Sequence, residues 1–442
     1  MTFEELNLNK PLLNALNDLG LTTPTTIQQK VFSVVMSGKD VCGIAQTGTG
    51  KTYAYLLPCL RQYQFSKDKN PQILILVPTR ELVVQVVEEI KKLTTYMSTL
   101  VVGIYGGVNT KAQIAEVMQG VDILVATPGR LVDLLNVQVI KTKGIKKLVI
   151  DEFDEMLNLG FRPQLTRIFD SLPERRQNLL FSATITDEVE DLMKEFFNSP
   201  ERIEATPVGT PLSNITQIGY NVPNFYTKIN FLKYLLNKDA EMNKVLVFVS
   251  TKHLADVVFE HLEGDFQDKI AVIHSNKAQN HRFESVRRFE DGTCRILIAT
   301  DVIARGLDVE GVSHVINIDL PEEPQSYIHR IGRTGRADRK GIALSFVTAQ
   351  EKDALSAIQD LMKYKLPLQE MPAEVEKSDR ILPAEEPKID MPLFLVKPPK
   401  REDVGPAFHE KLDKNKKVNV RRDYEAEKKR KYGKSYKKRS RD

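Results

Sequence analysis

Ten short apolar runs place the strongest constraint on how this chain can fold. Each run precedes a longer amphipathic stretch, and short apolar segments that alternate with helical patterns predict the buried strands of parallel sheets with crossover helices. The first five runs are DVCGIA, QILILV, DILVA, KLVID and NLLFS, and the second five are KVLVFV, IAVIH, RILIA, HVINI and IALSFV. The sequence therefore predicts an α/β protein.

The two sets of runs are separated by EATPVGTPLSN, whose Pro, Gly and Thr content is typical of a linker. We expect a first α/β domain at residues 1–206, a linker at 207–214 and a second α/β domain at 215–365. Residues 366–442 are rich in Pro, Glu and Lys and lack periodicity, which predicts a flexible basic extension.

The positive charge of the chain is concentrated at its end. Residues 411–442 hold 15 Lys or Arg against 5 Asp or Glu, a net charge of +10, so that the net +4 of the whole chain leaves −6 for the preceding residues. A segment with so few aliphatic residues cannot form a core and is predicted to be disordered. It is either a solvated tail that aids solubility, a nuclear address if the source is eukaryotic, or a nucleic-acid tether, and we favour the tether because Tyr424, Tyr432 and Tyr436 are interspersed among the cations.

Composition also argues against several classes of protein. The three cysteines, at positions 42, 59 and 294, have neither disulfide nor metal-site spacing, which indicates a reducing compartment. The acidic start MTFEELNLNK does not resemble a signal peptide, and no apolar run approaches the length of a membrane span. We expect a cytoplasmic, monomeric protein without a membrane partner.

The stretch AQTGTGKT follows the apolar run DVCGI and precedes the apolar helical pattern YAYLLPCL, which is the order of a phosphate-binding loop. Glycine backbone N–H groups can wrap phosphates, the lysine reaches the terminal phosphate oxygens, and the threonine hydroxyl can bind Mg²⁺ at a helix N-terminus. Alanine stands where the general pattern has its first glycine. The predicted nucleotide-binding residues are Ala45, Gln46, Thr47, Gly48, Thr49, Gly50, Lys51 and Thr52.

The pair Asp151 and Glu152 follows the apolar run KLVI. Paired acids at a strand end often mark only a helix N-terminus, which favours negative charge. Beside a phosphate loop, a second interpretation is favoured. Asp151 would hold Mg²⁺ together with Thr52, largely through water, and Glu152 would orient or deprotonate the attacking water.

Eight motifs in fixed order resemble the DEAD-box RNA helicases. They are AQTGTGKT (45–52), PTREL (78–82), GG (106 and 107), TPGR (127–130), DEFD (151–154), SAT (182–184), TDVIARGLD (300–308) and HRIGRTGR (329–336). The similarity extends from Phe3 to about residue 365, and the compact core with a basic extension resembles the bacterial RhlE-type subgroup. This resemblance implies two tandem RecA-like domains.

The resemblance implies roles for further residues around the nucleotide. Gln28 would bond the adenine edge and Phe3 would stack on it, within a segment at residues 3–28, while Asp308 would touch the ribose. Arg333 and Arg336 would be arginine fingers, which makes them catalytic together with Glu152, Asp151 and Lys51. The residues expected to couple the sites at the domain junction are Asp154, Ser182, Thr184 and His329, although Ser and Thr after a strand are often only helix caps.

The resemblance also implies an RNA-binding surface. Its contacts would go mainly to phosphate and ribose, which makes binding independent of sequence, and 2′-hydroxyl groups would favour RNA over DNA. The implied residues are Pro78, Thr79, Arg80, Gly107, Thr127, Gly129 and Arg130 in the first domain and His274, Gln279, Arg282, Thr300 and Arg305 in the second.

Two positions depart from the family pattern. Phe153 replaces the alanine of the DEAD motif, and it either packs in apolar space or alters the coupling between the ATP and RNA sites. Ser275 replaces a usual glycine, which leaves the backbone of that loop in question.

The sequence therefore predicts an ATP-dependent RNA helicase that hydrolyses ATP with Mg²⁺ and separates short RNA duplexes locally. Ribosomal precursors or RNA-degradation assemblies are its expected partners. An ATP-gated RNA clamp is an alternative that RNA-stimulated phosphate release would test. A processive DNA translocase is a third, tested by comparing RNA and DNA as activators.

Overall fold

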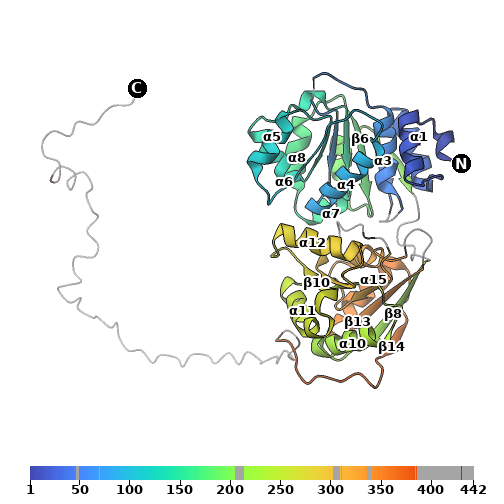
Figure 1. The fold of residues 1–442 in the computed structure, drawn as a ribbon, viewed down its shortest axis with the longest axis vertical. Coiled ribbons are helices and arrows are strands. Elements are labelled where there is room, and N and C mark those ends of the chain that lie inside the picture. The colour runs from blue at the N-terminus through green and yellow to red at the C-terminus, as the bar shows by residue number, and fades with distance from the viewer. Residues whose placement is uncertain are drawn as a thin grey trace, which may run out of the picture. The chain divides into compact units, whose positions relative to one another are not determined.

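The computed structural model of this chain contains two seven-stranded parallel sheets with helices on both faces of each (Figure 1). The structure describes residues 1–45, 49–68, 70–204, 214–301, 309, 311–335, 340–383, 385 and 430. Both sheets belong to one compact unit, Met1–Glu386. The predicted α/β class is confirmed.

The first sheet has the strand order β3-β4-β2-β5-β6-β1-β7. Its strands are β1 (Val41–Ile44), β2 (Ile73–Leu76), β3 (Val101–Ile104), β4 (Ile123–Ala126), β5 (Lys147–Ile150), β6 (Gln177–Ser182) and β7 (Glu201–Glu204). The α-helices around it are α1 (Lys10–Asp18), α2 (Thr26–Met36), α3 (Lys51–Arg61), α4 (Arg80–Leu93), α5 (Thr110–Met118), α6 (Pro128–Asn136), α7 (Phe153–Asn158), α8 (Arg162–Ser171) and α9 (Asp187–Phe196).

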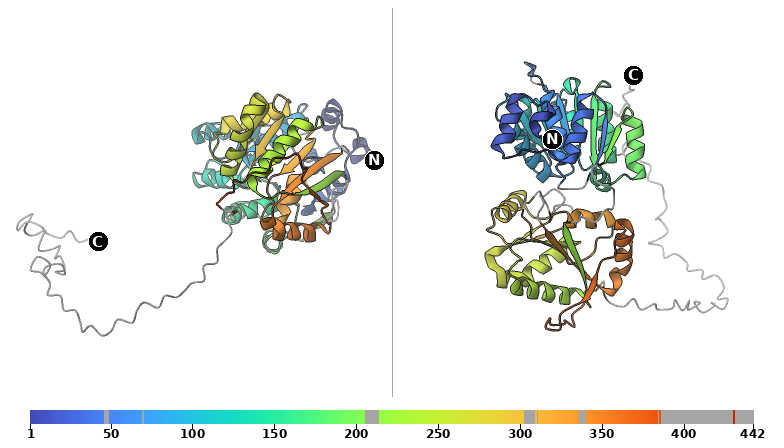
Figure 2. Two further views of the ribbon diagram at one scale, coloured as in Figure 1. Left: turned by 90° about the horizontal axis from the view of Figure 1, so that it is seen from below. Right: turned by 90° about the vertical axis from the view of Figure 1, so that its right-hand side faces the viewer.

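The second sheet repeats this organisation with the order β10-β11-β9-β12-β13-β8-β14, and Figure 2 shows both sheets from two further directions. Its strands are β8 (Ile215–Asn221), β9 (Val245–Phe248), β10 (Ile270–Ile273), β11 (Ile296–Ala299), β12 (His314–Asn317), β13 (Gly341–Val347) and β14 (Leu368–Glu370). Its helices are α10 (Phe225–Lys238), α11 (Lys252–Phe266), α12 (Gln279–Glu290), α14 (Pro324–Ile331) and α15 (Lys352–Met362).

The apolar runs are explained by burial of both faces of each sheet. In β2, Ile73 and Ile75 face one core cluster, which includes residues of α1 to α4, while Leu74 and Leu76 face another, which includes residues of α6 to α9. A strand covered by helices on both sides has no polar face, and its sequence is therefore continuously apolar rather than alternating. The carboxyl ends of the parallel strands all open at one edge of each sheet, where binding residues of such folds are found.

Four strands were not predicted, and each has positions that are only half-buried or exposed. Strand β14 is exposed along its length, and β7 buries one residue of four. Strand β8 alternates between buried and more exposed positions, and β3 has two half-buried positions of four. Three of them, β3, β7 and β14, lie at sheet edges. Partial exposure leaves no continuous apolar run for the sequence to show.

The predicted boundary at residue 366 requires correction. Strand β14 pairs in parallel with β8, and Leu366 is buried in the core. Beyond it, residues 371–383 and 385, which we call the α10 strap, lie along α10 (Figure 1), where Val375 is buried and Asn230 donates a hydrogen bond to the Glu376 carbonyl. The folded part therefore continues well past residue 365. Strand pairing, a hydrogen bond to the backbone and apolar packing hold this segment in place, although its sequence shows no periodicity.

The predicted linker lies almost wholly outside the described residues, as does nearly all of the basic segment 411–442. Within the described part of the chain, no helix is both long enough and apolar enough to cross a membrane.

Candidate functional site

The described part of the phosphate loop leads directly into α3. Gly50 is the N-cap residue and has a left-handed backbone with φ of +87°. A Cβ atom at this position would lie 2.6 Å from the Gln28 Nε2 atom, so only glycine fits. Lys51 and Thr52 follow in the first turn, and the Lys51 side chain is buried, with no hydrogen-bond partner for its ammonium among the residues that the structure describes.

Gln28 contacts the end of this loop. Its Nε2 donates to the Gly50 carbonyl at 3.1 Å and its Oε1 accepts from the Thr25 N–H at 2.9 Å. An amide has two donors and two acceptor lone pairs, so one of each is left for a ligand. Phe3, in contrast, is 4% exposed within the core and offers almost no open ring face. Its stacking role stays a prediction.

Asp151 and Glu152 lie at the carboxyl end of β5, and both are buried. Glu152 has a left-handed backbone, with φ of +52°, that is unusual for a side chain of this size. Its N–H donates to the Asp151 Oδ1 at 2.9 Å, while its Oε2 has no partner in the described part of the chain. Burial raises the pKa of Glu152 to about 7, although Lys51 and Arg333 oppose the shift. Burial also raises the pKa of Asp151, against the effect of Lys51.

Three of the four predicted coupling residues form one hydrogen-bonded cluster. The Asp154 Oδ2 accepts from the Thr184 N–H at 2.9 Å and from the Thr184 hydroxyl at 2.8 Å. The Ser182 hydroxyl accepts from the Asp154 N–H at 3.3 Å and donates to the Thr184 carbonyl at 2.7 Å. These hydrogen bonds connect the end of β6 to the first turn of α7, directly beside Glu152.

The fourth predicted coupling residue, His329, lies in α14, one of the helices that surround the second sheet. Its Nδ1 atom lies 2.7 Å from the Oε1 atom of Glu155, and both side chains are buried. Sequence reasoning missed Glu155, although it directly follows the DEFD motif. Arg333 is also buried, and its influence on the pKa of Glu152 places its positive charge near that carboxylate.

The predicted RNA residues of the first half gather at the ends of β2, β3 and β4. Gly107 has φ of +78°, and a Cβ atom there would lie 1.9 Å from Nη1 of Arg80. Arg130 is buried and donates from Nη2 to the Val108 carbonyl at 3.2 Å. Thr79 and Thr127 are the N-cap residues of α4 and α6, and Pro78 and Gly129 lie beside them.

In the second half, α12 brings Gln279 and Arg282 to the Arg80 region. Gln279 accepts a hydrogen bond from Arg80 at 3.1 Å and donates one to Glu81 at 3.1 Å, and Arg282 forms a buried ion pair with Glu81. Burial and the nearby Arg282 guanidinium lower the pKa of Arg80. Sequence reasoning missed Glu81 as the carboxylate between these arginines.

His274 and Thr300 complete the described part of the second set, at the carboxyl ends of β10 and β11. The His274 Nε2 lies 3.0 Å from the Asp256 Oδ1, and its buried Nδ1 has no partner within the described ranges. Thr300 is buried, and its N–H donates to the Ile273 carbonyl at 3.4 Å. Both residues therefore lie at the same edge of the sheet.

Both departures from the family pattern are accommodated. Phe153 is fully buried in a core cluster that includes Cys42 and Ile44, as the packing hypothesis predicted. Ser275 is exposed and does not have a left-handed backbone, so its loop does not need the freedom of glycine. Six predicted site residues lie outside the described residues, namely Gln46, Thr47, Gly48, Arg305, Asp308 and Arg336.

Two protein-family models match the sequence segments that contain these site residues. The DEAD/DEAH box helicase model covers residues 25–192, and the helicase conserved C-terminal domain model covers residues 227–338. A Bacillus subtilis protein named DEAD-box ATP-dependent RNA helicase CshA is 38% identical over 368 residues, which are 83% of this chain and 73% of that protein. The chain belongs to the DEAD-box family of ATP-dependent RNA helicases. CshA of Listeria monocytogenes is similarly related, with 39% identity over 83% of this chain and 70% of that protein.

Solved DEAD-box structures share the fold. Saccharomyces cerevisiae Dbp5 bound to RNA and ADP BeF3 matches with a TM-score of 0.77 and 30% identity, over 84% of this chain and 96% of that one. Mss116p bound to single-stranded RNA and AMP-PNP matches with a TM-score of 0.76 and 27% identity, over 84% and 78%. The expected pair of tandem RecA-like domains is confirmed.

Proposed function

We propose that this chain is an RNA-stimulated ATPase that couples hydrolysis to local separation of short RNA duplexes. The observation that carries the proposal is a pair of buried groups without a hydrogen-bond partner among the described residues, the Lys51 ammonium and the Glu152 Oε2. Leaving a charged or polar group buried without a partner is costly. A triphosphate beside Lys51 and a water beside Glu152 would supply both partners.

In this proposal Glu152 removes the proton from the water that attacks the γ-phosphate. A base works best when its pKa is near the operating pH, and burial has brought the pKa of Glu152 to about 7. Arg333, and Arg336 beyond the described residues, would stabilise the charge that develops on the phosphoryl group. An arginine in this role accelerates transfer by about 10³- to 10⁵-fold.

The donor set fits Mg²⁺ as well as ATP. Asp151 provides a buried carboxylate at the end of β5 and Thr52 a hydroxyl in the first turn of α3. Mg²⁺ keeps several waters and binds one or two carboxylates plus substrate phosphates, so two protein ligands are sufficient. When bound, the ion would neutralise phosphate charge. Gln28 would use its remaining donor and acceptor on adenine, Phe3 would stack on the base and Asp308 would bind the ribose.

The RNA site is supported by the positive charge that Arg130 and Arg282 concentrate near Arg80. Such a cluster suits the phosphates of a single strand. We extend this site to the other implied contacts, Pro78, Thr79, Gly107, Thr127, Gly129, His274, Gln279, Thr300 and Arg305. The basic segment 411–442 would add a tether that is independent of RNA sequence.

Finer assignments go beyond the family. We propose helicase domains at residues 1–206 and from residue 215 onward, the second ending with the α10 strap, and a monomeric cytoplasmic protein that acts on ribosomal precursors or in RNA-degradation assemblies. Membership of the RhlE-type subgroup stays a prediction, since the relatives described above carry the name CshA.

The test is phosphate release by the full-length chain with ATP alone, with single-stranded RNA and with single-stranded DNA. Strong stimulation by RNA and weak stimulation by DNA are expected. Release that RNA does not accelerate, combined with ATP-dependent retention of RNA, would instead support the ATP-gated clamp. Equal stimulation by DNA would support the DNA translocase.

A further inference from the structure

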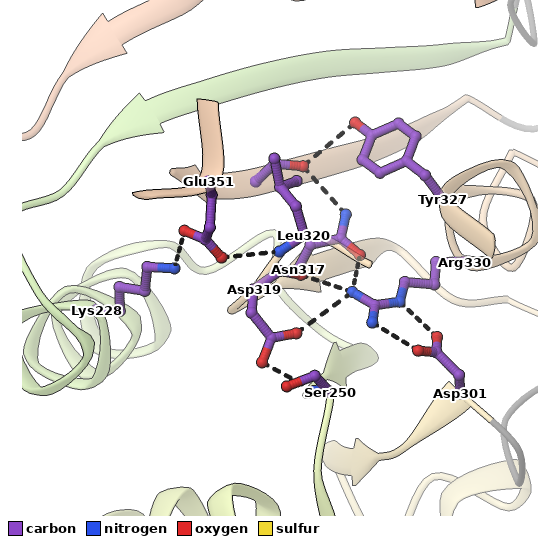
Figure 3. Close-up of polar contacts among 10 residues, drawn as sticks. Lys228, Ser250, Asp301, Asn317, Asp319, Leu320, Tyr327, Arg330 and Glu351 are labelled. Atoms are coloured by element: carbon purple, nitrogen blue, oxygen red, sulfur yellow. Dashed lines mark hydrogen bonds and ion pairs between the residues drawn. The ribbon is translucent and has the colours of Figure 1, made fainter. Parts of the chain in front are cut away.

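Arg330 is a fully buried arginine in α14 that lies between two residues of the proposed site, His329 and Arg333. Figure 3 shows its guanidinium between the carboxylates of Asp301 and Asp319. The Arg330 Nε and Nη2 atoms donate to the two oxygens of Asp301 at 2.5 and 2.7 Å. The Nη1 atom donates to the Asp319 carbonyl at 2.6 Å and lies 3.6 Å from the Asp319 carboxylate.

These partners come from the ends of three neighbouring strands. Asp301 follows β11, Asp319 follows β12, and the Asp319 Oδ2 accepts a hydrogen bond at 2.8 Å from the N–H of Ser250, which follows β9. The guanidinium carbon also lies 5.3 Å from the ring centre of Phe248, the last residue of β9. One side chain of α14 therefore holds the carboxyl edge of the sheet at three strands.

The position of Asp301 in the chain gives this contact a functional meaning. Asp301 directly follows Thr300, a proposed RNA contact, in the sequence. Arg330 directly follows His329, which contacts Glu155 of the first half. Arg333 lies one helical turn further on, and its Nε donates to the His329 carbonyl at 3.3 Å. A single bidentate pair thus connects the RNA edge to the segment that carries the arginine finger.

We propose that Arg330 is a positioning residue, which through Asp301 fixes α14 and Arg333 relative to the RNA-contacting end of β11. The proposal rests on the proposed RNA-stimulated ATPase activity. A planar guanidinium can hold both oxygens of Asp301 and the Asp319 carbonyl at once, which a lysine ammonium cannot do with the same geometry. Arg330 is therefore expected to matter for its shape as well as its charge.

The same half offers a matched control. The buried Lys228 and the partly exposed Glu351 form another ion pair, at 2.6 Å, and Figure 3 shows it beside the Arg330 network. The second Glu351 oxygen accepts from the Leu320 N–H at 3.0 Å. Among the described residues, Glu351 forms hydrogen bonds with Lys228, Leu320 and Thr348, none of which belongs to the proposed site, so Glu351→Gln should weaken the fold of this half without moving α14 relative to Thr300.

The experiment compares Asp301→Asn, Arg330→Lys and Glu351→Gln in the full-length chain. RNA-stimulated ATPase would be titrated with single-stranded RNA, and each melting temperature would be measured. We expect Asp301→Asn and Arg330→Lys to raise the RNA concentration for half-maximal stimulation by about fivefold or more, and to lower the rate at saturating RNA. Glu351→Gln should lower the melting temperature while the half-maximal RNA concentration stays that of the wild type.

A lowered melting temperature in all three variants with an unchanged half-maximal RNA concentration would overturn the proposal. If Asp301→Asn does not fold, Arg330→Lys decides by the same criterion. If neither folds whereas Glu351→Gln does, the pair is a folding determinant and the positioning role is wrong. A wild-type chain without RNA stimulation would reject the proposed function itself, which is a separate outcome.

Discussion

Two buried sites, one in each half of the molecule, use polar groups in opposite ways. In the first half, the Lys51 ammonium and the Glu152 Oε2 are buried without a partner among the described residues. In the second half, Arg330 is more deeply buried, yet each of its three guanidinium nitrogens donates a hydrogen bond. Within the described residues, the first two groups lack a hydrogen-bond partner, whereas every guanidinium nitrogen of Arg330 has one.

This difference indicates that the two sites have different functions. Unpaired buried groups favour any ligand that satisfies them, because binding removes a desolvation penalty that folding left in place. Saturated networks gain nothing from a ligand, but they hold backbone segments in fixed positions. The groups around Lys51 and Glu152 therefore have the features of a binding and reacting surface, and the Arg330 network has those of a scaffold that would present Arg333 to it.

Removing the Glu152 carboxylate should have the largest effect. Glu152→Gln retains the size of the side chain and loses the base, so ATP hydrolysis should fall by about 10²-fold or more. ATP-dependent RNA binding should persist, because Lys51 and the RNA contacts are unchanged. The measurement is phosphate release together with RNA retention in the presence of ATP. Hydrolysis that remains within about twofold of the wild type would show that the assigned role is wrong.

Phe153 tests whether packing beside the site can be separated from its chemistry. Phe153→Ala removes a fully buried ring and should reduce the free energy of unfolding by about 3–5 kcal/mol, or less if the site collapses. Thermal melts would measure this change, and ATPase and unwinding would be assayed well below the melting temperature, where activity should persist. An equally stable variant that hydrolyses ATP without unwinding would place Phe153 in the coupling between sites.

Truncation before the α10 strap would test where the folded second half ends. A chain that stops after residue 386 should melt like the full-length protein, whereas one that stops after residue 365 should lose about 2–5 kcal/mol of stability, comparable to the loss of one buried leucine. The shorter chain loses Leu366, Val375 and the hydrogen bond that Glu385 accepts from the Phe225 N–H at 2.7 Å. Equal melting temperatures for the two truncations would show that neither β14 nor the strap stabilises the second half.

The basic segment should have the smallest effect on catalysis. Deletion of residues 411–442 should weaken RNA binding and flatten its salt dependence, because each lost phosphate contact lowers the slope of log K against log salt by about 0.7. The ATPase rate at saturating RNA should stay that of the full-length chain. Identical salt slopes for the two chains would exclude a tethering role.

The sequence predicted the elements whose signal is local. Both-face burial produced continuous apolar runs for ten strands, and turn chemistry made Gly50 and the loop before α3 recognisable. The half-exposed strands β3, β7, β8 and β14 lacked such runs, and their pairing depends on neighbours that are distant in sequence. For the same reason the α10 strap was assigned to a flexible extension.

The site shows the same limit. Asp154, Ser182 and Thr184 were grouped through the resemblance, and the structure brings them into hydrogen-bonding contact. Glu155 and Glu81 were missed, because their partners His329 and Arg282 are more than 170 residues away along the chain. Burial and charge pairing across such separations arise only when the chain has folded.

The left-handed backbone of Glu152 has a consequence for how this position can evolve. Holding a non-glycine residue in this conformation costs roughly 1–2 kcal/mol. Glycine would remove that cost and asparagine would reduce it, so selection for thermostability alone would replace the acid at residue 152. Screens that enrich heat-resistant variants should therefore recover substitutions at residue 152 that raise the melting temperature and abolish ATP hydrolysis. Stability and catalysis thus make opposite demands on the backbone conformation of this one residue.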